Sequence, residues 1–312
     1  MIYNLLDMKK YILISICFLI VAYTQNSCNT GTKIVGIGKS VETSSNLNVT
    51  DITKIRNNSM IDVKVIYSET PKLTLRAQEN VLEMIDVKIS GNTLIVDILP
   101  NTNLTTTDIT TVNVFISRLT SICANGSGNI ETSGDFISMS EMNVDVNGSG
   151  DIKINRIECA DLHLNIAGSG SINAEKFKSS DTEVLVNGSG DINIKNLHTA
   201  KISTTISGSG DVSIKDLHTE TLSTTIVGSG DVNYIGNTTS HSINILGSGD
   251  INAFNLISKT AKISVLGSGD TKVFATETLD IVINGSGDVF YKGDSQITLK
   301  SIGSGKVKKI SS

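Results

Sequence analysis

The tripeptide Gly-Ser-Gly recurs ten times between residues 126 and 305, and successive copies begin 18 to 22 residues apart. These copies contain 20 of the 27 glycines in the chain, so one repeated turn accounts for most of an unusual composition. A fixed period near 20 residues is typical of a solenoid, in which each repeat packs only against its neighbours. The repeat therefore argues against an ordinary two-layer domain for most of the chain.

Apolar and polar residues alternate on both sides of each turn. Around Gly148, for example, Val144 and Val146 precede the turn, and Ile152 and Ile154 follow it. Strict alternation with many β-branched residues is typical of strands that bury one face. No segment between the motifs keeps a helical period, so each repeat is predicted to contain two strands and no helix.

We predict an all-β fold: a single-stranded parallel β-helix of about ten coils of about 20 residues, with an irregular β N-terminal cap. An antiparallel sandwich also has many short strands, but it does not require the same turn at the same place ten times. In a stack the equivalent turns lie over one another, so glycine is expected to supply a positive φ and a close backbone approach. The predicted structural turns include Gly148, Gly150, Gly168, Gly170, Gly188, Gly190, Gly208, Gly210, Gly228 and Gly230.

Four parts are predicted along the chain. Residues 1–27 are a signal peptide, 28–44 a linker, 45–120 irregular β coils or a cap, and 121–312 the Gly-Ser-Gly β-helix. The third part holds both prolines and a predicted tight turn at Gly91. We expect it to cover the first edge of the stack, where unpaired strands would otherwise recruit another chain.

The N-terminal segment has the features of an export signal. Lys9 and Lys10 precede a short apolar run, 11–22, which is too short to span a bilayer. The cysteine that follows, Cys28, is placed as in a bacterial lipoprotein signal, where it is lipidated. Cleavage after Thr24 by an ordinary signal peptidase is the alternative. Both interpretations place the mature chain outside the cytoplasm, with Cys28 as the candidate lipidation site.

Composition limits the partners. The chain has no Trp, only 4% aromatic residues and a net charge of −5, so it lacks both the stacking surfaces and the positive charge that nucleic acids require.

Cys123 and Cys159 occupy different positions of the repeat and are expected to be unpaired. We therefore predict no nucleic-acid partner, no cysteine metal site and no cofactor.

An aspartate follows Gly-Ser-Gly in seven of the ten copies. If the coils stack in register, these carboxylates form a column, and neighbours about 4.8 Å apart repel by about 0.9 kcal/mol per pair even in water. Backbone N–H donors of the turn would compensate for this repulsion. Ca²⁺ held between coils is the alternative, although the unit lacks the nine-residue pattern of calcium-binding solenoids. The candidate Ca²⁺ ligands are Asp191, Asp211, Asp231 and Asp250.

Other rows of equivalent residues receive structural interpretations. The amides of Asn173, Asn193, Asn233 and Asn252 are expected to hydrogen-bond along the stack.

His198 and His218 stand at the same place in successive units, but no third metal ligand is evident, so we interpret them as a surface duplication. Val227, Leu246 and Leu266 stand just before the turn and are predicted to point outward as a small apolar stripe.

The segments NGSGDIKI, AGSGSINA, NGSGDINI and SGSGDVSI, together with ITKIRNNSMIDVKV and VLEMIDVKISGNTLIVDI, resemble the head GIN domain. This is an adhesin-like domain of unknown function that is common in exported proteins of Bacteroidetes. The likeness covers about residues 45 to 310. It implies a β-helical, exported, surface-attached protein, and it brings no catalytic residues with it.

The sequence predicts a non-enzymatic exported β-solenoid that acts as a lipid-anchored binding or adhesion scaffold of the cell envelope. Its partner would be an envelope or host glycan or protein, and its membrane contact would be made only through the N-terminal lipid. A carbohydrate-active β-helix enzyme is the first alternative, and it would require a deep groove with paired carboxylates. A Ca²⁺-stabilised solenoid is the second.

Overall fold

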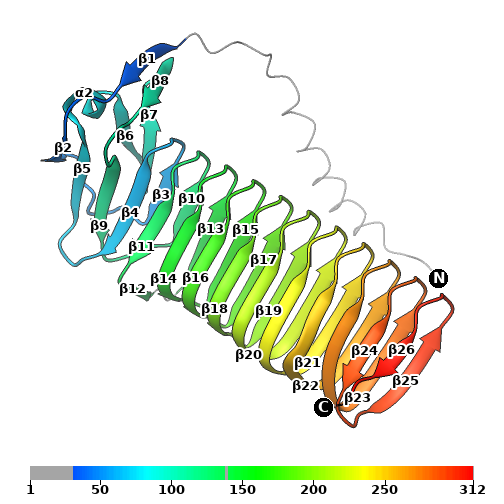
Figure 1. Cartoon of the computed structure of the whole chain (residues 1–312). Helices are drawn as coiled ribbons and strands as arrows, with labels where there is room; N and C mark the ends of the chain where they lie inside the picture. Colours follow the sequence, from blue (N-terminus) through cyan, green and yellow to red (C-terminus); the bar gives the residue numbers. More distant parts are fainter. Residues whose placement is uncertain (1–30, 138–139, 312) are drawn as a thin grey trace, which may run out of the picture.

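The computed structural model describes residues 31–137 and 140–311. Figure 1 shows a rod of stacked coils with a group of N-terminal strands covering one end. Consecutive coils pair in parallel and in register: Val144 lies beside Leu164, Leu164 beside Val184, and Val184 beside Thr204. The predicted parallel β-helix is therefore confirmed, and the antiparallel sandwich is excluded for the repeat.

The strands that precede each turn form one face of the rod, which we name the leading sheet. Its separate strands are β3 (Lys54–Asn57), β10 (Ser121–Ala124), β13 (Glu141–Val146), β15 (Asp161–Ile166), β17 (Asp181–Val186), β19 (Lys201–Ile206) and β25 (Gln296–Ser301). The strands that follow each turn form a second face, the trailing sheet. Its separate strands are β4 (Asp62–Tyr67), β11 (Ile130–Ser133), β12 (Asp135–Ile137), β14 (Ile152–Glu158), β16 (Ile172–Lys178), β18 (Ile192–His198), β24 (Val289–Lys292) and β26 (Val307–Lys309).

Four long strands join the two sheets near the C-terminal end of the rod. They are β20 (Val212–Ile226), β21 (Val232–Ile245), β22 (Ile251–Val265) and β23 (Thr271–Ile283). The first half of β20 pairs with β18 in the trailing sheet, and its second half pairs with β19 in the leading sheet. Each of these long strands therefore forms most of one coil.

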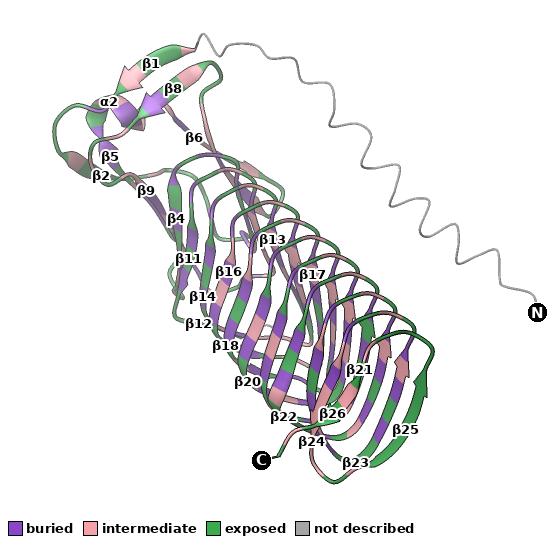
Figure 2. Cartoon of the chain, turned by 45° about the vertical axis from the view of Figure 1, so that its right-hand side comes forward, coloured by how far each residue is buried: buried purple, intermediate pink, exposed green. Residues whose placement is uncertain are grey.

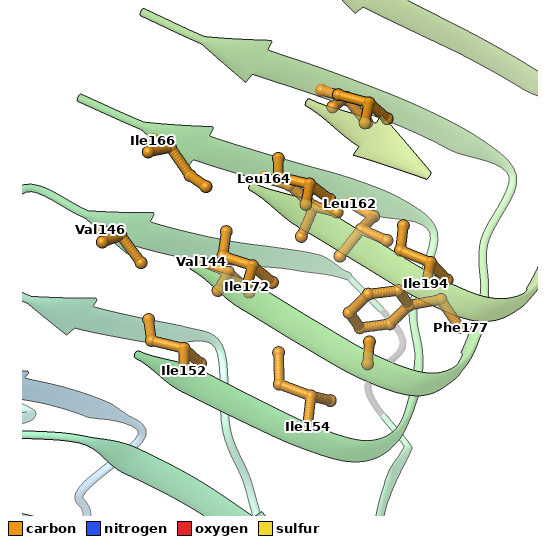
Figure 3. Close-up of a cluster of buried hydrophobic side chains, with 14 of the residues drawn as sticks. Val144, Val146, Ile152, Ile154, Leu162, Leu164, Ile166, Ile172, Phe177 and Ile194 are labelled. Carbon is orange, nitrogen blue, oxygen red and sulfur yellow. The ribbon is translucent and has the colours of Figure 1, made fainter. Parts of the chain in front are cut away.

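The core lies between the two sheets. Inward side chains alternate with exposed ones along the strands, as the burial colours in Figure 2 show. Val144 and Leu164 of the leading sheet point toward Ile154 and Phe177 of the trailing sheet, and all four are at most 2% exposed. Figure 3 shows these apolar side chains stacked coil upon coil. Their burial provides the main hydrophobic stabilisation of the rod.

Close backbone contact between successive turns explains the glycines. A Cβ atom added to Gly208 would lie 2.0 Å from the carbonyl oxygen of Gly188, and one added to Gly210 would lie 2.0 Å from that of Gly190. The expectation of a positive φ is wrong, because none of the Gly-Ser-Gly glycines has one. Steric exclusion between coils, and not a left-handed backbone, is the reason for glycine at these positions.

The first coil shows the same rule in reverse. Register with β10 and β11 places Ser59 and Ile61 where later coils have Gly126 and Gly128. A Cβ at either glycine would meet the carbonyl of the coil before it, at Ser59 or Ile61. No equivalent turn lies on the outer side of Ser59 and Ile61. The segment 99–110, which joins the two strands outside the first coil, leaves the stack and forms the strand Thr102–Thr105, which pairs with Thr32–Val35. Larger side chains are therefore accommodated there, and both Ser59 and Ile61 are buried.

The N-terminal cap contains a short helix and seven strands, two of which extend the sheets beyond the first coil. These elements are β1 (Thr32–Val35), β2 (Ser40–Ser44), β5 (Lys72–Gln78), α2 (Glu79–Leu82), β6 (Ile85–Ser90), β7 (Thr93–Ile98), β8 (Thr102–Thr105) and β9 (Thr111–Ile116). β7 adds to β3 and β9 adds to β4, both in parallel. β6 then pairs antiparallel with β7 across the predicted turn at Gly91, which has a φ of 60°. β5 pairs antiparallel with β9, and β2 with β5, so these strands cover the first edge of the stack.

No helix in the described part of the chain has the length and apolar character needed to cross a bilayer.

One histidine is enclosed in the core. His241 is 1% exposed, and its Nε2 atom lies 3.1 Å from the Oγ1 atom of Thr224. Its ring also lies near that of Tyr234, whose hydroxyl donates to Thr204 Oγ1 at 2.8 Å. Burial lowers the pKa of His241 to about 3, because the charged imidazolium cannot be solvated there. The histidine is therefore neutral in the folded protein at physiological pH.

We expect Gly208→Ala to destabilise the fold by about 2–4 kcal/mol, because its methyl group would overlap a backbone carbonyl that cannot move without disturbing the next coil. Ser209→Ala, at the neighbouring position of the same turn, is the matched control and should change stability by less than about 0.5 kcal/mol. Thermal unfolding followed by circular dichroism measures both. Equal melting temperatures for the two variants would contradict the steric explanation.

His241 should make the protein sensitive to acid. In the unfolded chain His241 takes up a proton below its ordinary pKa of about 6.5, whereas in the folded chain it does so only near pH 3. Stability therefore falls as the pH drops from about 6.5 toward 3, by at most about 1.4 kcal/mol per pH unit, and this effect vanishes above that range. His241→Leu, which copies the equivalent Leu222, should remove this dependence.

The measurement compares melting temperatures at pH 7 and pH 4.5 for the wild type, His241→Leu and His163→Ala, an exposed control. We expect only His241→Leu to lose less stability than the wild type on acidification. The same loss in all three proteins would show that other groups cause the acid sensitivity.

Candidate functional site

The residue after each turn links its coil to the next one. The Oδ1 atom of Asp211 accepts a hydrogen bond from the backbone N–H of Asp231 at 2.7 Å, and Asp231 accepts one from Asp250 at 2.7 Å. We name this row the aspartate ladder. Its members in order are Asp62, Asn129, Asp151, Ser171, Asp191, Asp211, Asp231, Asp250, Asp270, Asp288 and Lys306.

Three members of the ladder are not aspartates, and they show what the position requires. Asn129 accepts through its amide oxygen at 2.9 Å, and Ser171 accepts through its hydroxyl at 3.3 Å. Lys306 ends the row by donating its backbone N–H to Asp288. An acceptor is therefore sufficient, and a negative charge is not required. Asp62, the first member, cannot be found from the motif because no Gly-Ser-Gly precedes it.

Three adjoining hollows lie on the outer surface of the trailing sheet, with volumes of about 180, 640 and 380 Å³. Glu131 and Lys153 line both the first and the second, and Asn193 and Ser213 line both the second and the third. The hollows therefore adjoin one another along the rod, and we name them together the polar groove. The second hollow is lined by Glu131, Thr132, Ser133, Lys153, Ile154, Asn155, Asn173, Ala174, Glu175, Asn193, Ile194, Lys195, Ser213 and Lys215.

Charged and amide side chains of successive coils contact one another along the polar groove. Lys195 Nζ lies 2.6 Å from Glu175 Oε1, and Asn193 donates to the Oδ1 atom of Asn173 at 3.3 Å. Asn252 donates to Asn233 in the same way at 3.1 Å. The surface thus presents hydrogen-bond donors and acceptors at the regular spacing of the strands.

The four predicted Ca²⁺ ligands lie together. The third hollow is lined by Asp191, Asp211, Asp231 and Asp250, along with Asn193, Val212, Ser213, Val232, Asn233, Asn252 and Lys272. In each of the four aspartates one carboxylate oxygen already accepts a backbone N–H. These contacts offset the repulsion within the column. Ca²⁺ binding by these residues stays a prediction.

The two stacked histidines have an acidic neighbour that sequence reasoning missed. The rings of His198 and His218 are 4.5 Å apart between centroids, and Asp216 Oδ1 lies 2.9 Å from His218 Nε2. The signal was available, since residues two apart on a strand share a face. Asp216 and His218 could therefore have been paired from the sequence.

The remaining predicted positions fall as follows. Val227, Leu246 and Leu266 are 51–52% exposed and point outward beside the turns. Cys123 and Cys159 are free thiols, and burial raises the pKa of Cys159 to about 12, so that it remains protonated. Cys28 lies outside the described residues.

The fold and the surface residues described above define the class of protein: it is a parallel β-solenoid with a polar outer face. A sequence profile of the family described as "Putative auto-transporter adhesin, head GIN domain" matches residues 51–238 and 182–295. The chain belongs to this family. No curated protein matches its sequence significantly.

Two solved structures with TM-scores above 0.5 share the fold, and a third is reported for its similarity in sequence. A protein from Parabacteroides merdae described as a "putative adhesin" is 20% identical with a TM-score of 0.54, covering 89% of this chain and 99% of its own. A "putative adhesin" from Parabacteroides distasonis is 19% identical with a TM-score of 0.54, covering 89% and 100%. A "Putative lipid binding protein" from the same species is 24% identical with a TM-score of 0.49, covering 90% and 100%.

The ladder predicts how substitutions at Asp211 should behave. Asp211→Asn keeps an acceptor for the N–H of Asp231 and removes a repulsive charge, so stability should change by less than about 0.5 kcal/mol. Asp211→Ala removes the acceptor and should cost about 0.5–1.5 kcal/mol. Urea unfolding of both variants measures the difference.

The same variants test the Ca²⁺ alternative. If the aspartates bind Ca²⁺, the ion should raise the melting temperature of the wild type, and Asp211→Asn should reduce that rise. A wild-type melting temperature that is unchanged by Ca²⁺ or EDTA would contradict the Ca²⁺ prediction and leave the hydrogen-bonding role.

Proposed function

We propose that this protein is a non-enzymatic, exported β-solenoid that acts as a binding or adhesion scaffold at the cell envelope, anchored by a lipid on Cys28. Membership of the head GIN domain family supports the adhesin-like role. The lipid anchor rests on the N-terminal sequence, in which a charged segment and a short apolar run precede the cysteine. The rod would then extend from the membrane surface and contact the bilayer only through that lipid.

The polar groove is the proposed ligand-binding surface, and the row of adjoining hollows along the rod is the observation that carries the proposal. Pockets for small drug-like molecules are enclosed and mostly apolar. This groove is instead open and elongated, and most of the residues that line it carry an amide, a hydroxyl or a charge. Such a surface suits an extended hydrophilic ligand, an envelope or host glycan or a polypeptide segment, that can bond with several coils at once.

The geometry of the groove favours binding over carbohydrate hydrolysis. Glu175 lies 2.6 Å from Lys195, and Glu131 lies 3.9 Å from Lys64. The two glutamate side chains are 55% and 52% exposed. A glycosidase holds its general acid in a desolvated site and pairs it with a second carboxylate across the bond to be cleaved. Solvated glutamates paired with lysines are better suited to fixing the surface charge pattern.

A charge-reversal experiment tests the proposed surface. Lys153 and Lys215 are exposed lysines of the groove, and Lys153→Glu/Lys215→Glu should weaken ligand binding at least about tenfold, because it removes their N–H donors and reverses the local potential. The matched control, Lys262→Glu/Lys300→Glu, makes the same change in net charge on the leading sheet and should stay within about twofold of the wild type.

Binding is measured on a glycan array and with intact bacterial and host cells, using labelled protein. Retention of wild-type binding by the groove variant, or equal losses in both variants, would contradict the assignment of the groove. Release of reducing sugar from a bound glycan would support the enzyme alternative instead.

A further inference from the structure

A second cluster of ligand-type side chains lies on the trailing sheet, outside the lining of the polar groove. His198 is the last residue of β18, and Asp216 and His218 lie in β20, the next strand along the stack. His198 pairs directly with His218 in the parallel register. One ligand atom from each of the three residues lies within 4.8 Å of the other two. Zn²⁺ bonds to nitrogen and oxygen are about 2.1 Å long, so two ligand atoms of one ion lie at most about 4.2 Å apart. Small side-chain rotations would therefore bring the three ligand atoms to a single ion.

The backbone fixes the positions of these side chains. Leu197 and Leu217 are fully buried, and alternate residues of a strand face opposite ways, so the residues on either side of each leucine face outward. Asn196 donates a hydrogen bond to Asp216 Oδ2, which orients the carboxylate. The second carboxylate oxygen therefore remains directed toward His218, at 2.9 Å.

We propose that His198, Asp216 and His218 form a binding site for a divalent transition-metal ion such as Zn²⁺, held between two adjacent coils. Two imidazole nitrogens and one carboxylate oxygen are ligands that Zn²⁺ commonly takes in proteins. The side chains of Asp216 and His218 are 48% and 40% exposed, so an ion can reach them from solvent and keep water in the remaining position. The proposal does not depend on the ligand of the polar groove.

Asn237 contacts the ring nitrogen of His218 that faces away from Asp216. Its Nδ2 atom lies 2.9 Å from His218 Nδ1, and when this amide nitrogen donates to Nδ1 the proton of the neutral ring is on Nε2, facing Asp216. Metal binding at Nε2 requires that this proton move to Nδ1. A rotation of the Asn237 amide then presents its Oδ1 atom as the acceptor for Nδ1–H. The second contact would orient the metal-bound ring, as outer hydrogen bonds of metal-ligating histidines generally do.

The site is confined to two coils. In the same register, Lys178 precedes His198 along the stack and Asn237 follows His218. A histidine pair with an aspartate is therefore a local feature of these two units and not a property of the repeat. One ion per chain is the expected stoichiometry.

Titration calorimetry of the mature full-length protein with ZnCl₂ tests the proposal. We expect one Zn²⁺ per chain, and we expect His198→Ala, His218→Ala and Asp216→Asn each to weaken its binding at least about tenfold. The matched control is His163→Ala, which removes another exposed histidine that also has a carboxylate, Glu183, at 3.1 Å. Its Zn²⁺ affinity should stay within about twofold of the wild type.

Melting temperatures without metal confirm that each variant is folded, and melting with Zn²⁺ gives a second measurement. Zn²⁺ should raise the melting temperature of the wild type and of His163→Ala, but not that of His198→Ala/His218→Ala. Absence of Zn²⁺ binding to the wild type would overturn the proposal. Wild-type affinity in the folded double variant would overturn it as well, because the ion would then have other ligands.

Discussion

Each Gly-Ser-Gly turn lies so close to the turn of the preceding coil that a single Cβ atom would overlap its carbonyl oxygen. This contact holds one corner of every coil in the same conformation. Differences in repeat length must then be taken up elsewhere, and the register shifts between β20 and β23 lie away from the turns, as between Ile214 and Leu217. The conformation of the turns is therefore constant. The residues outside the turns absorb the variation in repeat length, which runs from 18 to 22 residues.

Stacking of identical turns also aligns their side chains, which has an electrostatic consequence. Like charges placed about one strand spacing apart repel, and a column of aspartates would be unfavourable without compensation. The backbone N–H of the next coil supplies that compensation at 2.7–2.9 Å for the aspartates. The same geometry leaves a row of carboxylates on the surface, so the structural ladder and the candidate ion-binding hollow are built from the same residues.

The outer faces of the coils are under weaker constraint than the turns and the core. A residue that points into solvent can change without creating a cavity or a steric overlap, so function can evolve there on a constant scaffold. The polar groove uses several coils at once. The histidine cluster uses two, and it differs from a simple duplication by one residue, since Asp216 stands where the preceding coil has Asn196.

Periodicity made the regular part of the fold predictable. Alternation, a constant spacing and a repeated glycine turn are local features, and together they imply parallel coils, a buried inner face and an aligned column of aspartates. Even so, the physical role of glycine was only half inferred, because a missing Cβ can serve either a positive φ or a close approach. Only the backbone geometry between coils distinguishes the two.

The start of the stack was decided only by the tertiary structure, because it depends on contacts between segments far apart in the chain. The chain leaves the stack after β4, builds the antiparallel part of the cap, and returns at β10 on the other side of β3. This pairing places Ser59 in the first turn and Asp62 at the head of the ladder. No local pattern specifies it, because its stability comes from burying strand edges and side chains that are brought together only when the whole cap has folded. The sequence alone determined the repeated coil, and the long-range pairing decided where the stack begins and how it is closed.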